Sequence, residues 1–170
     1  MRMVALMNMR SQVMLDAQLS PYRRSELRLA KEFIAAIPNN SVTLFDKGFW
    51  GAGILLNVAN QGQQRHWLIP ERKGLIYEEI DRYSENDRLL QMKVSPQARK
   101  RNPNLPETWQ VRAVRYTVSG KSKTVFTPLP HEHYSDAQVA DLYHERWEIE
   151  LGFRDIKSSM QNNKGVSSTR

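Results

Sequence analysis

A run of acidic, basic and phenolic side chains near the carboxyl end of the chain could perform chemistry on a phosphate group. Residues 143–157 read Y-H-E-R-W-E-I-E-L-G-F-R-D-I-K, and a stretch with no proline and one glycine is typical of a helix. At about 100° per residue, Arg146, Glu150 and Lys157 fall within about 60° of Tyr143, beside the apolar stripe of the same helix. Charges at such a margin are partly desolvated and need a partner. Two kinds of partner fit: the neighbouring side chains, or a metal ion together with a phosphate.

A second acidic side chain with a suggestive position is Asp46. It follows the short apolar run at residues 42–45, which is typical of a buried strand, and it precedes Gly48. Functional acids are common at the carboxyl ends of strands in α/β folds. Aspartate is also common as a helix cap or turn residue. The residues around Asp46 therefore leave both interpretations open.

Composition limits the classes of protein that this chain can be. It has 170 residues, of which 40% are hydrophobic and 25% charged, enough for one domain with a core, or one domain with an insertion. The sequence contains no cysteine, which excludes disulfides, thiolate metal sites and cysteine nucleophiles and fits a reducing cytoplasm. No apolar run approaches the roughly 20 residues of a membrane span, and no signal peptide pattern is present. We therefore expect a cytoplasmic protein.

The net charge of +7 suits a polyanionic partner, although an ordinary basic protein would carry it too. Three consecutive cations, Arg99, Lys100 and Arg101, stand beside a proline in residues 97–104. The segment is typical of an exposed loop that could contact phosphates, and such charge runs are also often merely solvated.

Two further groups have both a functional and a structural interpretation. His131 and His133 could bind a metal, although a loop that faces solvent is the more common setting. Trp109 could stack on an extruded base, whereas a tryptophan in a strand more often packs in the core. For both groups the structural interpretation is favoured.

The remaining pattern predicts the elements that must position these groups. Alternating apolar residues predict a hairpin of strands at 2–9 and 12–19, and helical spacing predicts helices at 25–37 and 52–60. Between residues 65 and 130 the pattern predicts antiparallel strands and no long helix. These strands are expected at 66–69, 89–94, 108–118 and 123–127. A long helix is expected at 137–160, capped by Ser135-Asp136.

The charged strip also matches a known signature. Tyr143, Arg146, Glu150 and Lys157 have the spacing Y-x2-R-x3-E-x6-K. Together with L-F-D-K-G-F-W around Asp46, this spacing resembles the bacterial insertion-sequence transposases that have an Asp-Asp-Glu catalytic triad (the insertion-sequence-four-like family). The opening R-M-V-A-L-M-N-M-R-S and the later D-A-Q-L-S-P-Y resemble that family's second and third core strands. The resemblance covers nearly the whole chain, to about residue 160.

The resemblance implies a fold and a division of the chain. The expected fold is α/β: an RNase H-like core that lacks its first strand and is interrupted by an antiparallel β-rich insertion. The first part of the core would be residues 1–64, the insertion 65–130 and the carboxyl-terminal core helix 131–160. Residues 161–170 would be a frayed polar tail.

The resemblance also implies an activity and its residues. Such enzymes cleave phosphodiesters with divalent metals and transfer DNA strands, and Mg²⁺ or Mn²⁺ prefers carboxylate oxygens. Asp46 and Glu150 would be the catalytic metal ligands, and Tyr143, Arg146 and Lys157 would contact the DNA. The cations at 99–101 would be additional DNA contacts. The partner would be double-stranded DNA at transposon ends.

The sequence departs from the family pattern at both ends, so other functions are also considered. The family's first catalytic Asp would lie upstream of residue 1, and its usual continuation after residue 160 is not seen. We therefore expect a fragment truncated at both ends, with negligible strand transfer by itself. One alternative is a non-catalytic DNA-binding remnant that pairs with a full-length transposase and inhibits it. The partner of the chain would be a second copy, in a homodimer, or the full-length transposase. Another alternative is an unrelated basic α/β domain whose charged strip is structural.

Overall fold

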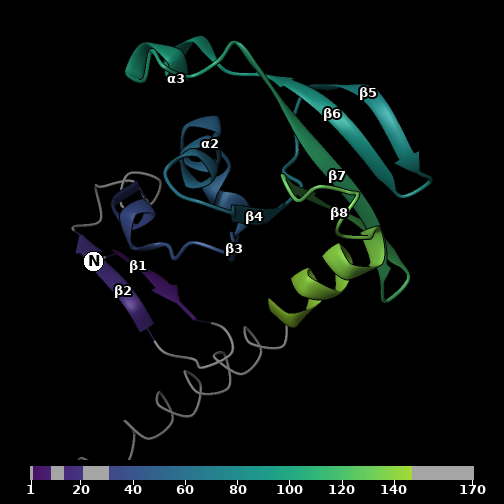
Figure 1. The fold of residues 1–170 in the computed structure, drawn as a ribbon, viewed down its shortest axis with the longest axis horizontal. Helices are drawn as coiled ribbons and strands as arrows, with labels where there is room; N and C mark the ends of the chain where they lie inside the picture. The colour runs from purple at the N-terminus through teal and green to yellow at the C-terminus, as the bar shows by residue number, and fades with distance from the viewer. Residues whose placement is uncertain (1, 9–13, 21–30, 147–170) are drawn as a thin grey trace, which may run out of the picture.

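The computed structural model describes residues 2–8, 14–20 and 31–146. Two antiparallel strands begin the chain, β1 (Arg2–Met7) and β2 (Met14–Ser20), and they pair with Ala5 opposite Ala17. The hairpin forms a two-stranded sheet of its own (Figure 1). This confirms the predicted pair of strands, while the connecting residues lie outside the described ranges.

A six-stranded mixed sheet forms the centre of the molecule, in the order β3-β4-β8-β7-β6-β5. The first pair, β3 and β4, is parallel, and all other neighbours are antiparallel. The strands are β3 (Ser41–Leu44), β4 (Arg65–Pro70), β5 (Tyr77–Ser84), β6 (Asp87–Lys93), β7 (Thr108–Val118) and β8 (Lys121–Thr127). The parallel pair needs a crossover connection, which α2 (Ala52–Asn60) provides at the predicted residues. The protein is therefore a mixed α/β fold, as the sequence predicts.

Helices cover both faces of this sheet at β4, so this strand is apolar on both sides. In β4, Trp67 and Ile69 belong to the core cluster beneath α2 and the 3-10 helix η1 (Lys31–Ala36), whereas Leu68 belongs to the cluster on the opposite face. The helix of residues 136–146 covers that opposite face (Figure 1). Alternate residues of a strand point to opposite faces, which explains the division.

The helix of residues 136–146 begins at a reciprocal cap. The Ser135 hydroxyl accepts a hydrogen bond from the Gln138 amide at 3.2 Å, and the Gln138 side chain accepts one from the Ser135 amide at 2.9 Å. This capping box satisfies two amides that the helix would otherwise leave unpaired. The predicted cap is confirmed, and the rest of the predicted helix lies outside the described residues.

Three elements differ from the sequence prediction. The segment expected to be an exposed loop with three cations contains the short helix α3 (Pro96–Arg101), because Ser95 caps it and proline is favoured at its first position. Strand β5 was not expected at all. Its residues are nearly all exposed, so it has no apolar alternation, and it forms by backbone pairing with β6. Within the predicted helix 25–37, the described residues 31–36 form the 3-10 helix η1.

Candidate functional site

Asp46 stands where the chain leaves the edge of the central sheet. The Phe45 amide donates to the Leu68 carbonyl at 2.8 Å, which extends the parallel pairing one residue beyond β3. Asp46 then caps the short 3-10 helix η2 (Lys47–Phe49), and its Oδ1 accepts from the Gly48 amide at 2.9 Å. The capping interpretation therefore holds for one carboxylate oxygen. The side chain is 54% exposed, which leaves the other oxygen free to meet a second group.

That second group is the guanidinium of Arg146. Its Nη2 lies 3.2 Å from Asp46 Oδ2, although the two residues are 100 positions apart. Its Nη1 donates to the Tyr143 hydroxyl at 2.7 Å. The end of β3 and the helix of residues 136–146 thus converge, and they do so at residues that the sequence had singled out separately.

Tyr143 is a buried side chain and not a surface phenol. It is 3% exposed and packs with Leu68, Val125 and Val139 on one face of the sheet. Burial is the main cause that raises the pKa of the phenol to about 12, so the hydroxyl stays protonated at neutral pH. Because its oxygen accepts from Arg146, Tyr143 anchors the helix and orients the guanidinium toward Asp46.

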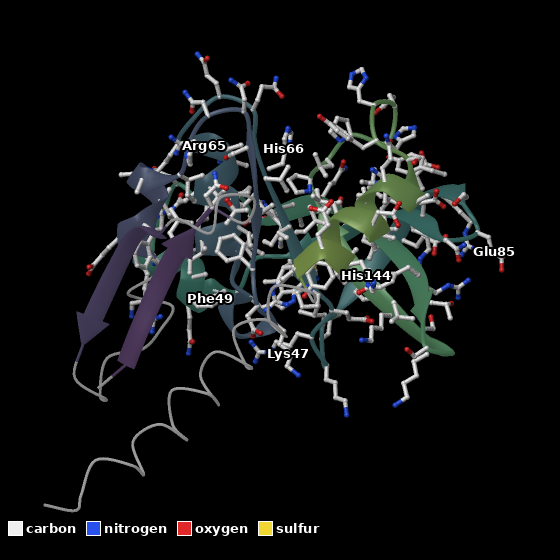
Figure 2. The ribbon with its side chains drawn as sticks, turned by 90° about the horizontal axis from the view of Figure 1, so that it is seen from below. Lys47, Phe49, Arg65, His66, Glu85 and His144 are labelled. Carbon is white, nitrogen blue, oxygen red and sulfur yellow. The ribbon has the colours of Figure 1, made fainter. Side chains whose placement is uncertain are left out.

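An open groove of about 380 Å³ surrounds the contact between Asp46 and Arg146. Three further charged side chains line this Asp46 groove: Lys47, Glu71 and Lys123. Figure 2 labels Lys47 below the carboxyl-terminal part of the helix that carries His144. Lys47 could have been found from sequence because it follows Asp46 directly. Glu71 and Lys123 could not, since only the pairing of β4 with β8 brings them there.

The groove offers oxygen ligands to a hard metal ion. Its carboxylates are those of Asp46 and Glu71, and both side chains are exposed to solvent. Carboxylate oxygens are what Mg²⁺ and Mn²⁺ prefer. Within residues 2–8, 14–20 and 31–146, no three His, Asp or Glu side chains form a cluster suited to a metal. Glu150 and Lys157, predicted from the signature, lie outside these ranges.

The three consecutive cations are not part of this groove. Arg99, Lys100 and Arg101 lie on α3, far from the helix of residues 136–146 (Figure 1). Arg99 is bound to Glu107 at 2.9 Å. A DNA contact by these residues would therefore be distant from Asp46.

The surroundings of the remaining candidates, one tryptophan and two histidines, favour structural roles for them. Trp109 is 7% exposed and packs against the rings of Trp50 and Trp67, as expected for core packing. His131 stacks on Tyr83 with ring centres 3.6 Å apart, and His133 is exposed in the same turn.

The raised pKa of Tyr143 predicts how stability depends on pH. In the unfolded chain the phenol ionises near its ordinary pKa of about 10, whereas in the folded protein the pKa is about 12. Between these values the unfolded chain has lost a proton that the folded protein keeps. The contribution of Tyr143 to stability should therefore be complete below pH of about 10 and decline toward about 12. The difference in urea unfolding between the native chain and Tyr143→Phe, measured against pH, checks this, because the variant should lack that part of the decline.

The end of β3 and the helix of residues 136–146 thus bring an acid and an arginine together in an open groove that carries further charged side chains. The chain belongs to the transposase DDE domain family, whose model matches residues 1–165. This confirms the resemblance read from the signature. No described helix has the length and apolar character needed to cross a membrane.

Relatives in Escherichia coli agree with this assignment. The chain is 38% identical to the transposase InsG of insertion sequence element IS4 over 96% of its own length, and it spans 37% of InsG. It is 48% identical to the putative transposase InsZ over 48% of this chain and 27% of that protein. A 34-residue stretch, 20% of this chain and 9% of the relative, is 53% identical to the putative transposase InsL of IS186A. No solved structure matches the chain significantly.

Proposed function

We propose that this chain supplies part of the catalytic domain of a DNA transposase, which cleaves phosphodiesters and transfers strands with the help of divalent metals. The observation that carries the proposal is the 3.2 Å contact between Asp46 and Arg146. It joins the two segments that the family signature requires to meet. The expectation that this chain catalyses no strand transfer by itself stays a prediction.

The fold supports an RNase H-like core in the proposal. A parallel pair of strands connected by a helix, with an acid at the end of the first strand, is the part of such a core that the described residues contain. The division into residues 1–64, 65–130, 131–160 and 161–170 stays a prediction. One feature bears on it: β4 pairs with β3 on one side and β8 on the other, so the sheet runs without a break across the predicted boundary at 64–65.

The metal site of the proposal is built on Asp46. Its exposed carboxylate and that of Glu71 line one groove, and on the predicted helix Glu150 follows Arg146 by one turn. Asp46 and Glu150 would be the ligands, with Glu71 as a further candidate. A bound Mg²⁺ or Mn²⁺ would stabilise negative charge on the reacting phosphate.

The cations of the groove would hold the DNA backbone. Arg146 is oriented by Tyr143 and presents a planar group that suits a phosphate. Lys47 and Lys123 extend the positive charge along the groove, and Lys157 would add to it by the signature. Tyr143 would act by positioning Arg146, because it is buried.

Metal binding tests the proposal through residues of this chain. Arg146 competes with a metal ion for Asp46 Oδ2, so Arg146→Gln should raise the affinity for Mn²⁺ by a few-fold, up to about tenfold. Asp46→Asn should abolish the specific binding of Mn²⁺, since an amide carries no charge. Isothermal titration with Mn²⁺ alone measures both effects.

Glu107→Gln is the matched control. Glu107 is a carboxylate paired with an arginine, as Asp46 is, but outside the groove, so its loss should leave Mn²⁺ binding unchanged. Equal Mn²⁺ affinity in the native chain, Asp46→Asn and Glu107→Gln would contradict the proposed metal site.

A second candidate is a non-catalytic DNA-binding protein, which forms a homodimer or pairs with a full-length transposase and inhibits it. The same ion pair favours it, because Arg146 already balances the charge of Asp46 without a metal. Salt-dependent binding to transposon-end DNA, together with no cleavage in Mg²⁺ or Mn²⁺, would support this candidate.

A further inference from the structure

A second cavity, separate from the Asp46 groove, has an apolar floor that opens to solvent. Its volume is about 300 Å³, which lies at the lower end of the roughly 300–1,000 Å³ of small-molecule sites. The floor consists of Trp50, Met92, Leu105 and Trp109, which are 6%, 6%, 8% and 7% exposed. Every other buried hydrophobic side chain in the described part of the chain is 4% exposed or less. The remaining exposure of the core is therefore concentrated at this cavity, where an apolar ligand would cover it.

Cations from four separate segments surround this floor. They come from η1, the connection between β4 and β5, strand β6 and helix α3: Lys31, Arg72, Lys93 and Arg101. None of the four forms an ion pair with another described residue. The described residues that line this basic cavity include no carboxylate. Like charges gathered without a counterion repel one another, so the cavity suits a ligand with several negative charges.

Two polar side chains of the basic cavity keep a hydrogen-bond donor for a ligand. The Ser95 hydroxyl accepts from the Ala98 amide at 3.2 Å, and the Asn102 side-chain oxygen accepts from the Asn104 amide at 3.3 Å. Both bonds use oxygen as acceptor, so the hydroxyl proton of Ser95 and the side-chain amide of Asn102 can still donate. A few such donors beside apolar walls are what fixes the orientation of a small ligand.

The floor favours an aromatic ring. The indole N–H of Trp50 donates to the Pro70 carbonyl at 2.6 Å, so the rest of that ring offers only apolar surface. Trp50 and Trp109 meet edge to face with ring centres 6.4 Å apart. Aromatic rings, and the thioether of Met92 beside them, make favourable contacts with a further ring. The ligand should therefore combine an aromatic ring with several negative charges.

We propose that the basic cavity binds a free nucleoside di- or triphosphate, with its base on the apolar floor and its phosphates among the four cations. Charge density favours this ligand over DNA. A DNA strand carries one charge on each nucleotide, so a base entering the cavity would bring a single phosphate to four cations. A nucleoside polyphosphate brings several charges on one small molecule. The site depends on neither metal binding at Asp46 nor DNA cleavage.

The basic cavity and the Asp46 groove lie along the same two short segments. Asp46 lines the groove and Trp50, four residues later, lines the cavity. Likewise, Glu71 lines the groove and the adjacent Arg72 lines the cavity. The hydrogen bond from Trp50 to Pro70 joins these two segments. A nucleotide in the cavity would therefore contact the segments that position both carboxylates of the groove, as an effector of that groove would.

Titration calorimetry of the chain in EDTA, without divalent metals, tests the two-part recognition. Adenosine triphosphate and adenosine diphosphate should bind, whereas adenosine and inorganic triphosphate should each bind at least about tenfold more weakly, because each lacks one half of the ligand. Binding should also change the fluorescence of the tryptophans on the floor. Equal affinity for inorganic triphosphate and adenosine triphosphate would overturn the proposal, since the floor would then play no part.

Single cations test the position of the site. Arg72→Gln and Lys93→Gln should each lower the affinity for adenosine triphosphate about fivefold, the effect of one exposed ion pair. Lys73→Gln is the matched control, because Lys73 is an exposed cation next to Arg72 that does not line the cavity. The three positions are exposed, and thermal unfolding verifies that each variant keeps its fold. An equal loss of affinity in Lys73→Gln would show diffuse attraction and would contradict the proposed site.

Competition with DNA separates the two sources of nucleotide. A short single-stranded oligodeoxynucleotide should displace adenosine triphosphate only at much higher nucleotide concentration. Displacement at equal concentration, with both ligands weakened alike by Arg72→Gln, would assign the cavity to DNA and overturn the proposal, as would no binding of either adenosine phosphate. Mn²⁺ titration of Arg72→Gln and Lys93→Gln should match the native chain, so failure here is distinct from failure of the Asp46 metal site.

Discussion

Replacing Tyr143 with alanine should lower the free energy of unfolding by about 3–4 kcal/mol, because truncation of a buried aromatic leaves a cavity as well as lost apolar contact. The ring is 3% exposed and packs in the cluster that attaches the helix of residues 136–146 to the sheet. The helix should therefore separate from the sheet, and Arg146 should no longer be held at Asp46. Urea unfolding followed by tryptophan fluorescence measures the loss of stability.

Tyr143→Phe separates the two roles of this side chain. It keeps the ring and removes the hydroxyl that accepts from Arg146 at 2.7 Å. The expected loss of stability is only about 1 kcal/mol, the usual value of one hydrogen bond. If alanine and phenylalanine have the same small effect, Tyr143 does not anchor the helix in solution.

Arg112→Met should lower the free energy of unfolding by about 3–5 kcal/mol, because it leaves a buried carboxylate without its partner. Arg112 on β7 binds Asp87 on β6 through two parallel contacts, 2.8 Å from Nε to Oδ1 and 2.6 Å from Nη2 to Oδ2. Its side chain is 3% exposed and that of Asp87 6%. Nη1 also donates to the Leu129 carbonyl at 3.2 Å, which fixes the segment leading to the helix of the Asp46 groove. Chemical denaturation of the variant measures the effect.

The double variant Arg112→Met/Asp87→Leu is the decisive comparison. Removing both charges leaves neither group unpaired, so the double variant should be more stable than Arg112→Met alone. The opposite order would show that the carboxylate of Asp87 reaches water when its partner is lost. In that case the pair is not buried in solution.

The sequence predicted helices and strands correctly where their residues showed one clear pattern. Helix α2 has the predicted bounds, and β7 was predicted residue for residue, because β-branched and aromatic residues dominate β7 and turn residues bound both elements. Strand β5 escaped prediction because its residues alternate in no apolar pattern, and only pairing with β6 makes it a strand. Helix α3 was not predicted because its three consecutive cations are typical of an exposed loop, although Ser95 provides a helix cap.

The types of the functional residues and their spacing were determined by the sequence alone, since a spacing such as Y-x2-R-x3-E-x6-K is a property of one helix. What the tertiary structure decided is which residues meet. Sequence placed Asp46 and Arg146 in separate elements, and the packing of the helix against the sheet brings them to 3.2 Å. The tertiary structure also buries Tyr143 and adds Glu71 and Lys123 to the groove. It places α3 far from this groove. The physical reason is that periodicity records which face of an element is apolar, whereas the partner of that face depends on contacts between residues far apart in the chain.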